Sequence, residues 1–327
     1  MFLMRKWMLM ALLSLTLLLA GCSAAGNTQP GKDAAQIPYE PDLPDTIRVD
    51  ESGIPQLEVY VTQEERIVPM DIESYLYGVL AGEMQNDWPE EALRAQAILA
   101  RTFVIKFLSE KESKYAGADI STDVEEAQAY DAEGINDRIR AAVDATKGMI
   151  VCYENEPIYA WFHSHAGGKT ARASEGLSYK AAAPYTQSVN SMESDAAAAE
   201  AQAWTATFDT QEVLAAAAEC GIKIEGDLHS VAMGAMGESG RVKTIRLNGL
   251  EAPANELRIA LGSTKMRSTM LSSVSLWNGQ VKLQGKGYGH GVGMSQWGAY
   301  AMAEQGKTAE EIIRYYFRNV DIVQKWR

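Results

Sequence analysis

The stretch from Gly287 to Gly298 restricts this chain more than any other, because five of its twelve residues are glycine. Glycine lets the backbone take positive φ angles and lie close to a neighbouring segment or a ligand. His290, Ser295 and Gln296 stand between the glycines, where they can bond sugar hydroxyls or the loop's own backbone. Tyr288 can stack on a sugar face or pack in the core. The stretch therefore predicts a binding loop.

The first 21 residues have the pattern of an export signal. Arg5 and Lys6 are charged, an apolar run follows, and Leu19-Ala-Gly-Cys22 matches a lipoprotein cleavage site. Residues 1–21 are therefore predicted to be a lipoprotein signal peptide. Lipidation of Cys22 would hold the protein on the extracytoplasmic side of the cell membrane. A single membrane anchor and an ordinary cleaved signal are the alternatives.

The remainder of the chain predicts a short linker and one domain. Residues 22–46 have almost no large apolar side chains and are predicted to be a disordered tether. Order is expected from Ile47, and residues 47–327 are long enough to bury a sizeable core. Ser191–Ala203 is rich in Ala and Glu and is expected to be a helical or mobile insertion.

Helical and strand patterns both occur, which predicts an α+β fold. Helices are expected over 72–84 and from Asp87-Trp-Pro-Glu90 to about Glu110, where a cap, a proline and a glutamate begin the helix. Short alternating segments, typical of strands, dominate after residue 147, and Met149–Tyr153 and Ile158–His163 are two of them. A last helix is expected from Ala309 to about Phe317.

Charge and cysteine content exclude two classes of protein. The net charge of −13 would repel nucleic acid and gives no general attraction to other anionic polymers, so any hold on such a polymer must come from local hydrogen bonds and stacking. With Cys22 assigned to lipid, Cys152 and Cys220 are too few for a disulfide framework. The sequence leaves open whether these two cysteines pair.

Three segments resemble the SpoIID/LytB domain family. The first is Tyr75–Met84 followed by Trp88–Phe103, the second is Gly287–Gly298, and the third is Trp161–Thr170, an aromatic strand that runs into a Gly-Gly turn. The resemblance covers residues 50–325, with the motifs in the family's order.

The resemblance implies a peptidoglycan lytic transglycosylase. Such an enzyme cleaves the MurNAc–GlcNAc β-1,4 bond, preferably in glycan strands stripped of stem peptides, and leaves a 1,6-anhydroMurNAc end without a required cofactor. The family also implies a partner amidase and a role in sporulation or cell-wall remodelling. Some relatives are modifiers of amidases, so a non-catalytic glycan-binding protein that stimulates an amidase is the alternative function. A solute-binding lipoprotein fits less well, because paired α/β lobes are not apparent.

Glu83 is the residue that the resemblance implies as the catalytic acid. A lytic cleavage needs one carboxyl group, which protonates the glycosidic oxygen and then accepts the proton of the C6 hydroxyl. The apolar neighbours Leu80, Ala81 and Met84 would raise the pKa of Glu83 by desolvation. An exposed glutamate at a helix end is the alternative. The substrate groove is expected between the Glu83 helix, the glycine-rich loop and the turn at His163–Lys169.

Further candidates for substrate binding lie on the second helix and the Gly-Gly turn. Arg101 stands beside an apolar stripe and needs a partner, either the substrate or a structural ion pair. Gln96 borders the same stripe, where it could contact substrate or pack between helices. Lys169 follows the two glycines of the turn and is assigned to substrate binding with the loop residues.

A zinc site is a second hypothesis for the turn. His163 and His165 are two residues apart and would lie on one face of a strand, and Cys152 lies on the preceding strand. Some members of the family are reported to carry zinc near this turn. A Cys in place of Ala166 would have strengthened this hypothesis, and the set has three ligands without a fourth. The alternative is that both histidines are structural or line the groove.

Overall fold

The computed structural model describes residues 37–40 and 42–327, and every structural statement below refers to them. The predicted signal peptide, Cys22 and most of the predicted tether lie outside the described residues. The described residues form one of the two units of the chain, Ile37–Arg327. None of their helices is long and apolar enough to cross a membrane.

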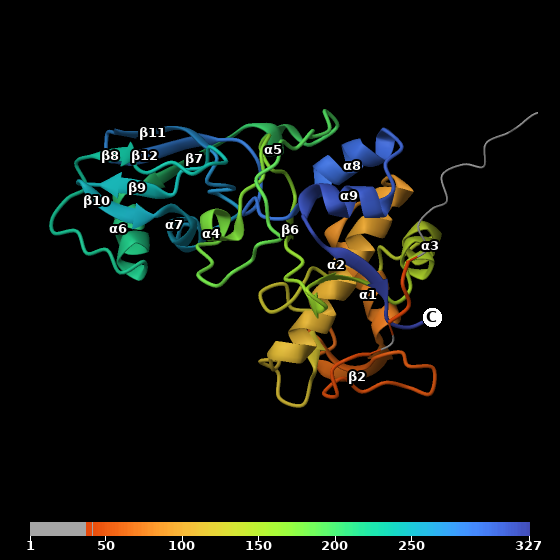
Figure 1. Cartoon of the computed structure of the whole chain (residues 1–327). Coiled ribbons are helices and arrows are strands. Elements are labelled where there is room, and N and C mark those ends of the chain that lie inside the picture. The colour runs from red at the N-terminus through yellow and green to blue at the C-terminus, as the bar shows by residue number, and fades with distance from the viewer. Residues whose placement is uncertain (1–36, 41) are drawn as a thin grey trace, which may run out of the picture. The chain divides into compact units, whose positions relative to one another are not determined.

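Helices and strands both contribute to the fold, so the predicted α+β class is confirmed (Figure 1). The helices are α1 (Ile72–Glu83), α2 (Glu90–Glu110), α3 (Asp137–Ala145), α4 (Ala173–Gly176), α5 (Ala199–Gln202), α6 (Thr210–Glu219), α7 (Ala254–Ala260), α8 (Gln296–Glu304) and α9 (Ala309–Tyr316). The strands are β1 (Gln56–Val61), β2 (Arg66–Asp71), β3 (Ile120–Ser121), β4 (Met149–Tyr153), β5 (Glu156–Pro157), β6 (Phe162–His163), β7 (Trp204–Asp209), β8 (Val231–Met233), β9 (Thr244–Leu247), β10 (Leu250–Pro253), β11 (Leu271–Trp277), β12 (Gln280–Gly285), β13 (Met294–Ser295) and β14 (Asp321–Gln324).

Helix α2 is the centre of the larger hydrophobic core. It contacts α1, α3, α8, α9 and β4. A single buried stripe was expected, but residues on every side of α2 are buried, Gln96 and Arg101 among them. Small alanines along the helix let its neighbours approach closely, and the polar side chains of a helix buried all round can find hydrogen-bond partners only inside the protein. The helix ends at Glu110, as predicted.

The chain becomes ordered earlier than the predicted start at Ile47. The N–H of Glu40 donates to the carbonyl of Gln324 over 2.8 Å, and the N–H of Gln324 donates to Pro38 over 2.8 Å. Tyr39 thereby forms a parallel bridge with Gln324 at β14. A segment that adds to a strand edge through its backbone needs no apolar alternation, which is why composition alone indicated a tether here.

A second hydrophobic core is built by residues 204–285, between β6 and β13. Strands β11, β12 and β7 form one antiparallel sheet, β10, β9 and β8 form another, and α6 and α7 contribute to the same core. On either side of this insertion, β6 and β13 pair in parallel, with Ser295 opposite His163. The insertion therefore leaves the Gly-Gly turn and the glycine-rich loop as direct neighbours.

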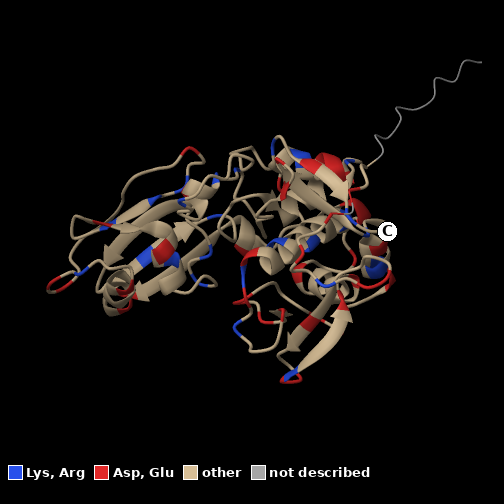
Figure 2. Ribbon diagram, turned by 60° about the horizontal axis from the view of Figure 1, so that its bottom comes forward, with Lys and Arg blue, Asp and Glu red and all other residues tan. Residues whose placement is uncertain are grey.

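Charged residues are distributed over both core regions. Figure 2 shows acidic and basic residues interspersed along the described ribbon. This distribution agrees with the acidic composition and offers a polyanion no general attraction.

Candidate active site

Helix α1 brings Glu83 to the end of a rigid element. Asp71 caps the first turn by accepting a hydrogen bond from the N–H of Ser74 over 2.9 Å. The apolar face of α1 is buried in the larger core, and the backbone of Met84 is extended, which ends the helix. Glu83 is therefore the last helical residue, with its side chain beside the loops that pack against α1.

The carboxylate of Glu83 is only partly exposed and accepts a backbone hydrogen bond. Its Oε1 atom receives the N–H of Ala129 over 2.8 Å. Burial raises the pKa of Glu83 to about 6, although the Ala129 N–H and the nearby amide of Gln296 favour the charged form. A carboxyl group with this pKa is partly protonated near neutral pH, as a general acid must be.

Glu83 lines an open depression of about 540 Å³. The depression is formed by residues 81–87 together with Asp131 and Gly134. Asp87 and Asp131 are the other carboxylates along its wall. The site thus combines one desolvated carboxyl group with open space. Neither the glycine-rich loop nor the turn at 163–169 lines this depression, so the groove expected between these segments and the Glu83 helix is corrected.

The glycine-rich loop needs its glycines for close packing. Gly289 and Gly291 have φ angles of 110° and 81°. A Cβ atom at Gly291 would lie 2.2 Å from the guanidinium carbon of Arg241, and one at Gly289 would lie 2.7 Å from the Cβ of His163. Larger residues at either position would push the loop away from the segments beneath it.

The end of the glycine-rich loop reaches Glu83. Ser295 caps α8 by accepting the N–H of Gly298 over 3.3 Å, which makes Gln296 the first helical residue. The side-chain amide of Gln296 then donates to the backbone carbonyl of Glu83 over 3.1 Å. The two motifs that are farthest apart in the sequence are therefore adjacent in the fold.

Comparison with known proteins agrees with the family resemblance of the three sequence motifs. Residues 60–153 match the SpoIID family model, described as stage II sporulation protein. The chain is 32% identical to stage II sporulation protein D of Bacillus amyloliquefaciens over 317 residues, which cover 91% of this chain and 87% of the relative. The chain belongs to the stage II sporulation protein D family.

Two further relatives widen the comparison. Stage II sporulation protein D of Bacillus subtilis (strain 168) is 32% identical and covers 91% of this chain and 84% of its own length. A protein named amidase enhancer from the same strain is 27% identical over 74% of this chain and 39% of its own length. The family resemblance inferred from the three motifs is confirmed.

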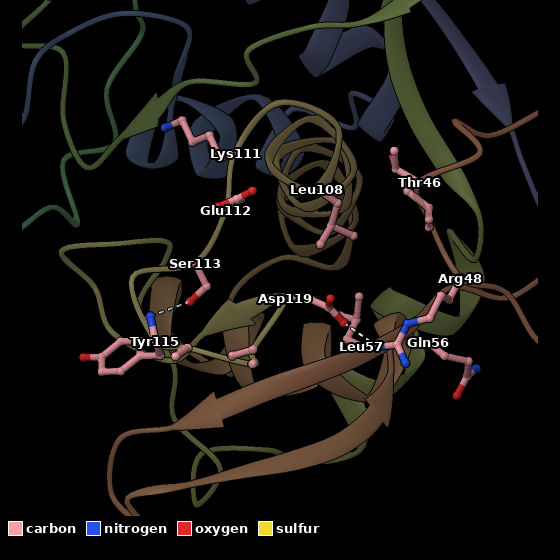
Figure 3. Close-up of a pocket in the computed structure, with 14 residues that line it drawn as sticks. Thr46, Arg48, Gln56, Leu57, Leu108, Lys111, Glu112, Ser113, Tyr115 and Asp119 are labelled. Carbon is pink, nitrogen blue, oxygen red and sulfur yellow. Dashed lines mark hydrogen bonds and ion pairs between the residues drawn. The ribbon is translucent and has the colours of Figure 1, made fainter.

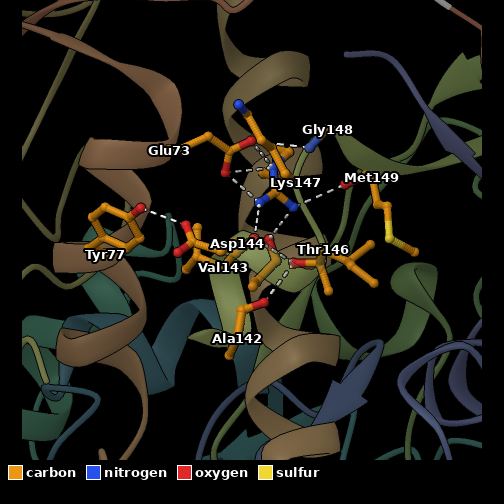
Figure 4. Close-up of polar contacts among 12 residues, drawn as sticks. Glu73, Tyr77, Ala142, Val143, Asp144, Thr146, Lys147, Gly148 and Met149 are labelled. Carbon is orange, nitrogen blue, oxygen red and sulfur yellow. Dashed lines mark hydrogen bonds and ion pairs between the residues drawn. The ribbon is translucent and has the colours of Figure 1, made fainter. Parts of the chain in front are cut away.

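Figure 4 shows the polar contacts around Glu73, which is the ion-pair partner of a buried arginine. In this member of the stage II sporulation protein D family, that arginine, Arg101, occupies a structural position. Its side chain is fully buried and pairs with Glu73, with Nη2 and Oε2 2.5 Å apart. It also donates to the carbonyls of Val143 and Met149 over 3.3 and 3.2 Å. The expectation that Arg101 contacts substrate is therefore corrected, because the guanidinium is enclosed and the structural ion pair is formed instead.

Gln96 and Ser295 are also enclosed. Gln96 is fully buried and has no hydrogen-bond partner in the described structure. Ser295 is fully buried too, and its hydroxyl bonds the carboxylate of Glu193 over 2.9 Å besides capping α8. Neither side chain presents a surface to a glycan, so the structure assigns them to packing and capping rather than to the predicted substrate contacts.

His290 in the glycine-rich loop and His163 beside the loop both contact the backbone of Val292. His163 lies with Nδ1 3.1 Å from the Val292 carbonyl, and Nδ1 of His290 accepts the Val292 N–H over 3.0 Å. Burial, with the nearby Arg258 and Arg241, lowers the pKa of His290 to about 3. The His290 ring is therefore neutral at physiological pH. Substrate binding by His290, which is partly exposed, stays a prediction.

Lys169 and Tyr288 each contact other parts of the chain. Lys169 donates from Nζ to the carbonyl of Glu238 over 3.0 Å. The Tyr288 ring lies 5.2 Å from the guanidinium of Arg267, and the Tyr288 backbone pairs with His165. Both Lys169 and Tyr288 keep partial exposure, so their role in substrate binding stays a prediction.

The predicted zinc ligands do not assemble. Within residues 37–40 and 42–327, no group of three His, Cys, Asp or Glu side chains is arranged to hold a metal ion. Cys152 lies buried on β4 in the larger core, whereas Nδ1 of His165 accepts the N–H of Gly167 over 3.0 Å. The combination of Cys152, His163 and His165 is therefore corrected. Cys152 and Cys220 are both free thiols.

Aromatic residues next to the loop pack against one another. The rings of Trp88 and Trp297 are 4.4 Å apart, and Tyr300 lies 5.2 Å from Trp88. Trp88 and Trp297 are largely buried. This cluster joins the start of α2 to α8 and so supports the placement of Gln296 beside Glu83.

Two residues at the site were missed in the sequence. Glu193 lies in the Ala/Glu-rich stretch that was expected to be an insertion, yet its carboxylate accepts the N–H of Ala166 over 2.9 Å and the hydroxyl of Ser295. Ala129 acts through its backbone N–H, which carries no signal in the residue type. Glu193 and Ala129 reach the site only through the tertiary packing of their segments.

A second pocket, of about 310 Å³, lies beside β1 and the loop 111–119 (Figure 3). Arg48 and Asp119 form an ion pair of 2.7 Å within it. None of the predicted site residues lines this pocket, so it is separate from the depression at Glu83.

Proposed function

We propose that this chain is a peptidoglycan lytic transglycosylase in which Glu83 is the acid. The observation that carries the proposal is the partly buried Glu83 carboxyl group, with its pKa raised to about 6, at an open depression. The proposed substrate is a glycan strand stripped of stem peptides.

The proposed reaction uses one carboxyl group twice. Protonated Glu83 donates its proton to the glycosidic oxygen as the bond between that oxygen and C1 of MurNAc breaks. The C6 hydroxyl of the same MurNAc then attacks C1 and returns a proton to Glu83, which restores the acid. The products are a 1,6-anhydroMurNAc end and a free GlcNAc hydroxyl, and the chemistry needs no cofactor.

Product analysis tests the proposal. The purified protein would be incubated with amidase-treated glycan strands, and the ends would be identified by mass spectrometry. Anhydro ends, unaffected by a metal chelator and absent with Glu83→Gln, are expected. Reducing ends would indicate hydrolysis by a second carboxylate, and Asp87 and Asp131 are the residues to substitute in that case.

The second candidate is a non-catalytic glycan-binding protein that stimulates an amidase. The similarity to the protein named amidase enhancer favours this alternative. Binding of glycan strands without new ends, together with faster stem-peptide release by an added amidase, would support it over the enzyme.

Lipid attachment at Cys22 and residence on the outer face of the cell membrane are part of the same proposal. The lipoprotein cleavage site at Leu19–Cys22 supports them. Intact-mass measurement of the membrane-extracted protein, compared with Cys22→Ser, tests the attachment directly.

A further inference from the structure

Helix α1 lacks side chains on the face where the segment 128–131 crosses it. Gly78 and Gly82 are one helical turn apart on this face. A Cβ atom on Gly82 would lie 2.6 Å from the backbone nitrogen of Tyr130 and 2.7 Å from the carbonyl carbon of Ala129. One on Gly78 would lie 2.2 Å from the Tyr130 ring. The crossing segment therefore lies directly on the backbone of α1.

Three contacts hold this segment in register with α1. The N–H of Asp131 donates to the carbonyl of Gly78 over 2.9 Å. The ring of Tyr130 stacks on Tyr75 with the centroids 5.8 Å apart. The third contact is the Ala129 N–H on Oε1 of Glu83, at 2.8 Å. The first two contacts fix the height of the Ala129 N–H along the helix, so the third has a defined geometry.

We propose that Ala129, seated on the Gly78–Gly82 face, is the positioning residue of the acid: its N–H holds Oε1 of Glu83 and leaves Oε2 to carry the proton. An oxygen that already accepts an N–H bond is the poorer site for a proton, because the proton would face the donor hydrogen. The free oxygen is the one that can be turned to the glycosidic bond. This inference rests on the proposed function of Glu83.

The pKa of Glu83 can be used to measure the hydrogen bond from the Ala129 N–H. The titratable groups near it are Asp87 and Asp131 along the depression and Tyr75 on α1. The crossing segment contributes Tyr130, whose ring lies over Gly78. The pKa of Glu83 is nevertheless set by burial, the Ala129 N–H and Gln296. Loss of the N–H removes a contact that favours the carboxylate, so the pKa must rise.

Two substitutions break the contact by different means. Ala129→Pro deletes the N–H, and Gly82→Ala drives the crossing segment away from the helix. Ala129→Ser is the matched control, because it keeps the N–H at a partly exposed position. Gly237→Ala is the control for a steric clash elsewhere, since its Cβ would lie 2.0 Å from Glu175. All variants would be made in the full chain.

The experiment measures the pKa of Glu83 by carboxyl carbon NMR, assigned with Glu83→Gln, and the alkaline limb of the cleavage profile in parallel. Both are expected to move to higher pH by about one unit in Ala129→Pro and Gly82→Ala, the size of a lost charge-assisted hydrogen bond. Gly237→Ala should leave both unchanged. Ala129→Ser, which keeps the N–H, should leave the NMR pKa of Glu83 unchanged.

The two readouts separate the inference from the function on which it rests. An unchanged NMR pKa of Glu83 in folded Ala129→Pro and Gly82→Ala would overturn the positioning role, whatever the activity. If the NMR pKa of Glu83 rises in the variants but the wild-type protein cleaves no glycan, the contact is established and the proposed transglycosylase function is overturned instead. If Ala129→Pro does not fold, Gly82→Ala alone decides.

Discussion

The side-chain amide of Gln296 donates a hydrogen bond to the backbone carbonyl of Glu83 over 3.1 Å, although the two residues are 213 positions apart. The contact joins the end of α1 to the start of α8. It also brings a polar side chain, only 7% exposed, beside the proposed acid. The position of Glu83 therefore depends on the glycine-rich loop as well as on its own helix.

Substitution of Gln296 should weaken cleavage without loss of the fold. Gln296→Ala removes the bond to Glu83 and is expected to lower kcat by about 10-fold, since a lost hydrogen bond of this kind corresponds to about 1–1.5 kcal/mol. Gln305→Ala, at the exposed C-terminal end of the same helix, is the control. Equal cleavage rates for the two variants would show that the Gln296 side chain does not contribute to cleavage.

Glu83→Gln should abolish the formation of anhydro ends while the protein stays folded. Loss of a general acid costs at least about 100-fold in rate. Glutamine keeps the size of the side chain, so circular dichroism and the melting temperature should change little. The exposed Glu304, substituted by Gln, is the control for charge. Full activity in a folded Glu83→Gln protein would contradict the proposed function.

Activity should fall as the pH rises through about 6. The proposed acid must be protonated, and the pKa of Glu83 is about 6 in the fold. The same group stabilises the folded state at low pH: its folded pKa exceeds the ordinary 4.5, so its contribution is complete below 4.5 and is lost as the pH rises through 6. Cleavage rates and denaturant midpoints between pH 4 and 8, in wild type and Glu83→Gln, measure both effects. If the difference in denaturant midpoint between wild type and Glu83→Gln does not change with pH, the raised pKa of Glu83 is excluded.

Arg101 should prove essential for stability. Arg101→Met leaves the Glu73 carboxylate buried without its cation and is expected to cost about 3–5 kcal/mol of unfolding free energy. Urea denaturation measures the loss. The double variant Glu73→Gln with Arg101→Met should recover part of it, because no unpaired charge remains. A stable Arg101→Met protein with reduced glycan affinity would restore the substrate-binding interpretation.

Much of the helical framework followed from local patterns. The second helix ends at Glu110 as predicted, and α1 begins at Ile72 and ends one residue before the expected Met84. Strand β4 matches the alternating segment at Met149–Tyr153. In contrast, only Phe162–His163 of the predicted strand at 158–163 is assigned to a strand, and just before it the N–H of Trp161 donates back to the carbonyl of Tyr159. Periodicity indicates which face can be buried, but pairing depends on what lies beside it.

Residue types and spacing were enough to indicate the family, the α+β class and Glu83 as the residue to test. They were not enough for Arg101, which resembles a binding residue until its partner Glu73 is known. Nor could they place Glu193, Gln296 or the Ala129 N–H, since each acts through a contact between distant segments. Local sequence determines the helix that carries a carboxyl group. Only the packed chain determines which groups desolvate it and hold one of its oxygens, because solvation and hydrogen bonding depend on every neighbour in space.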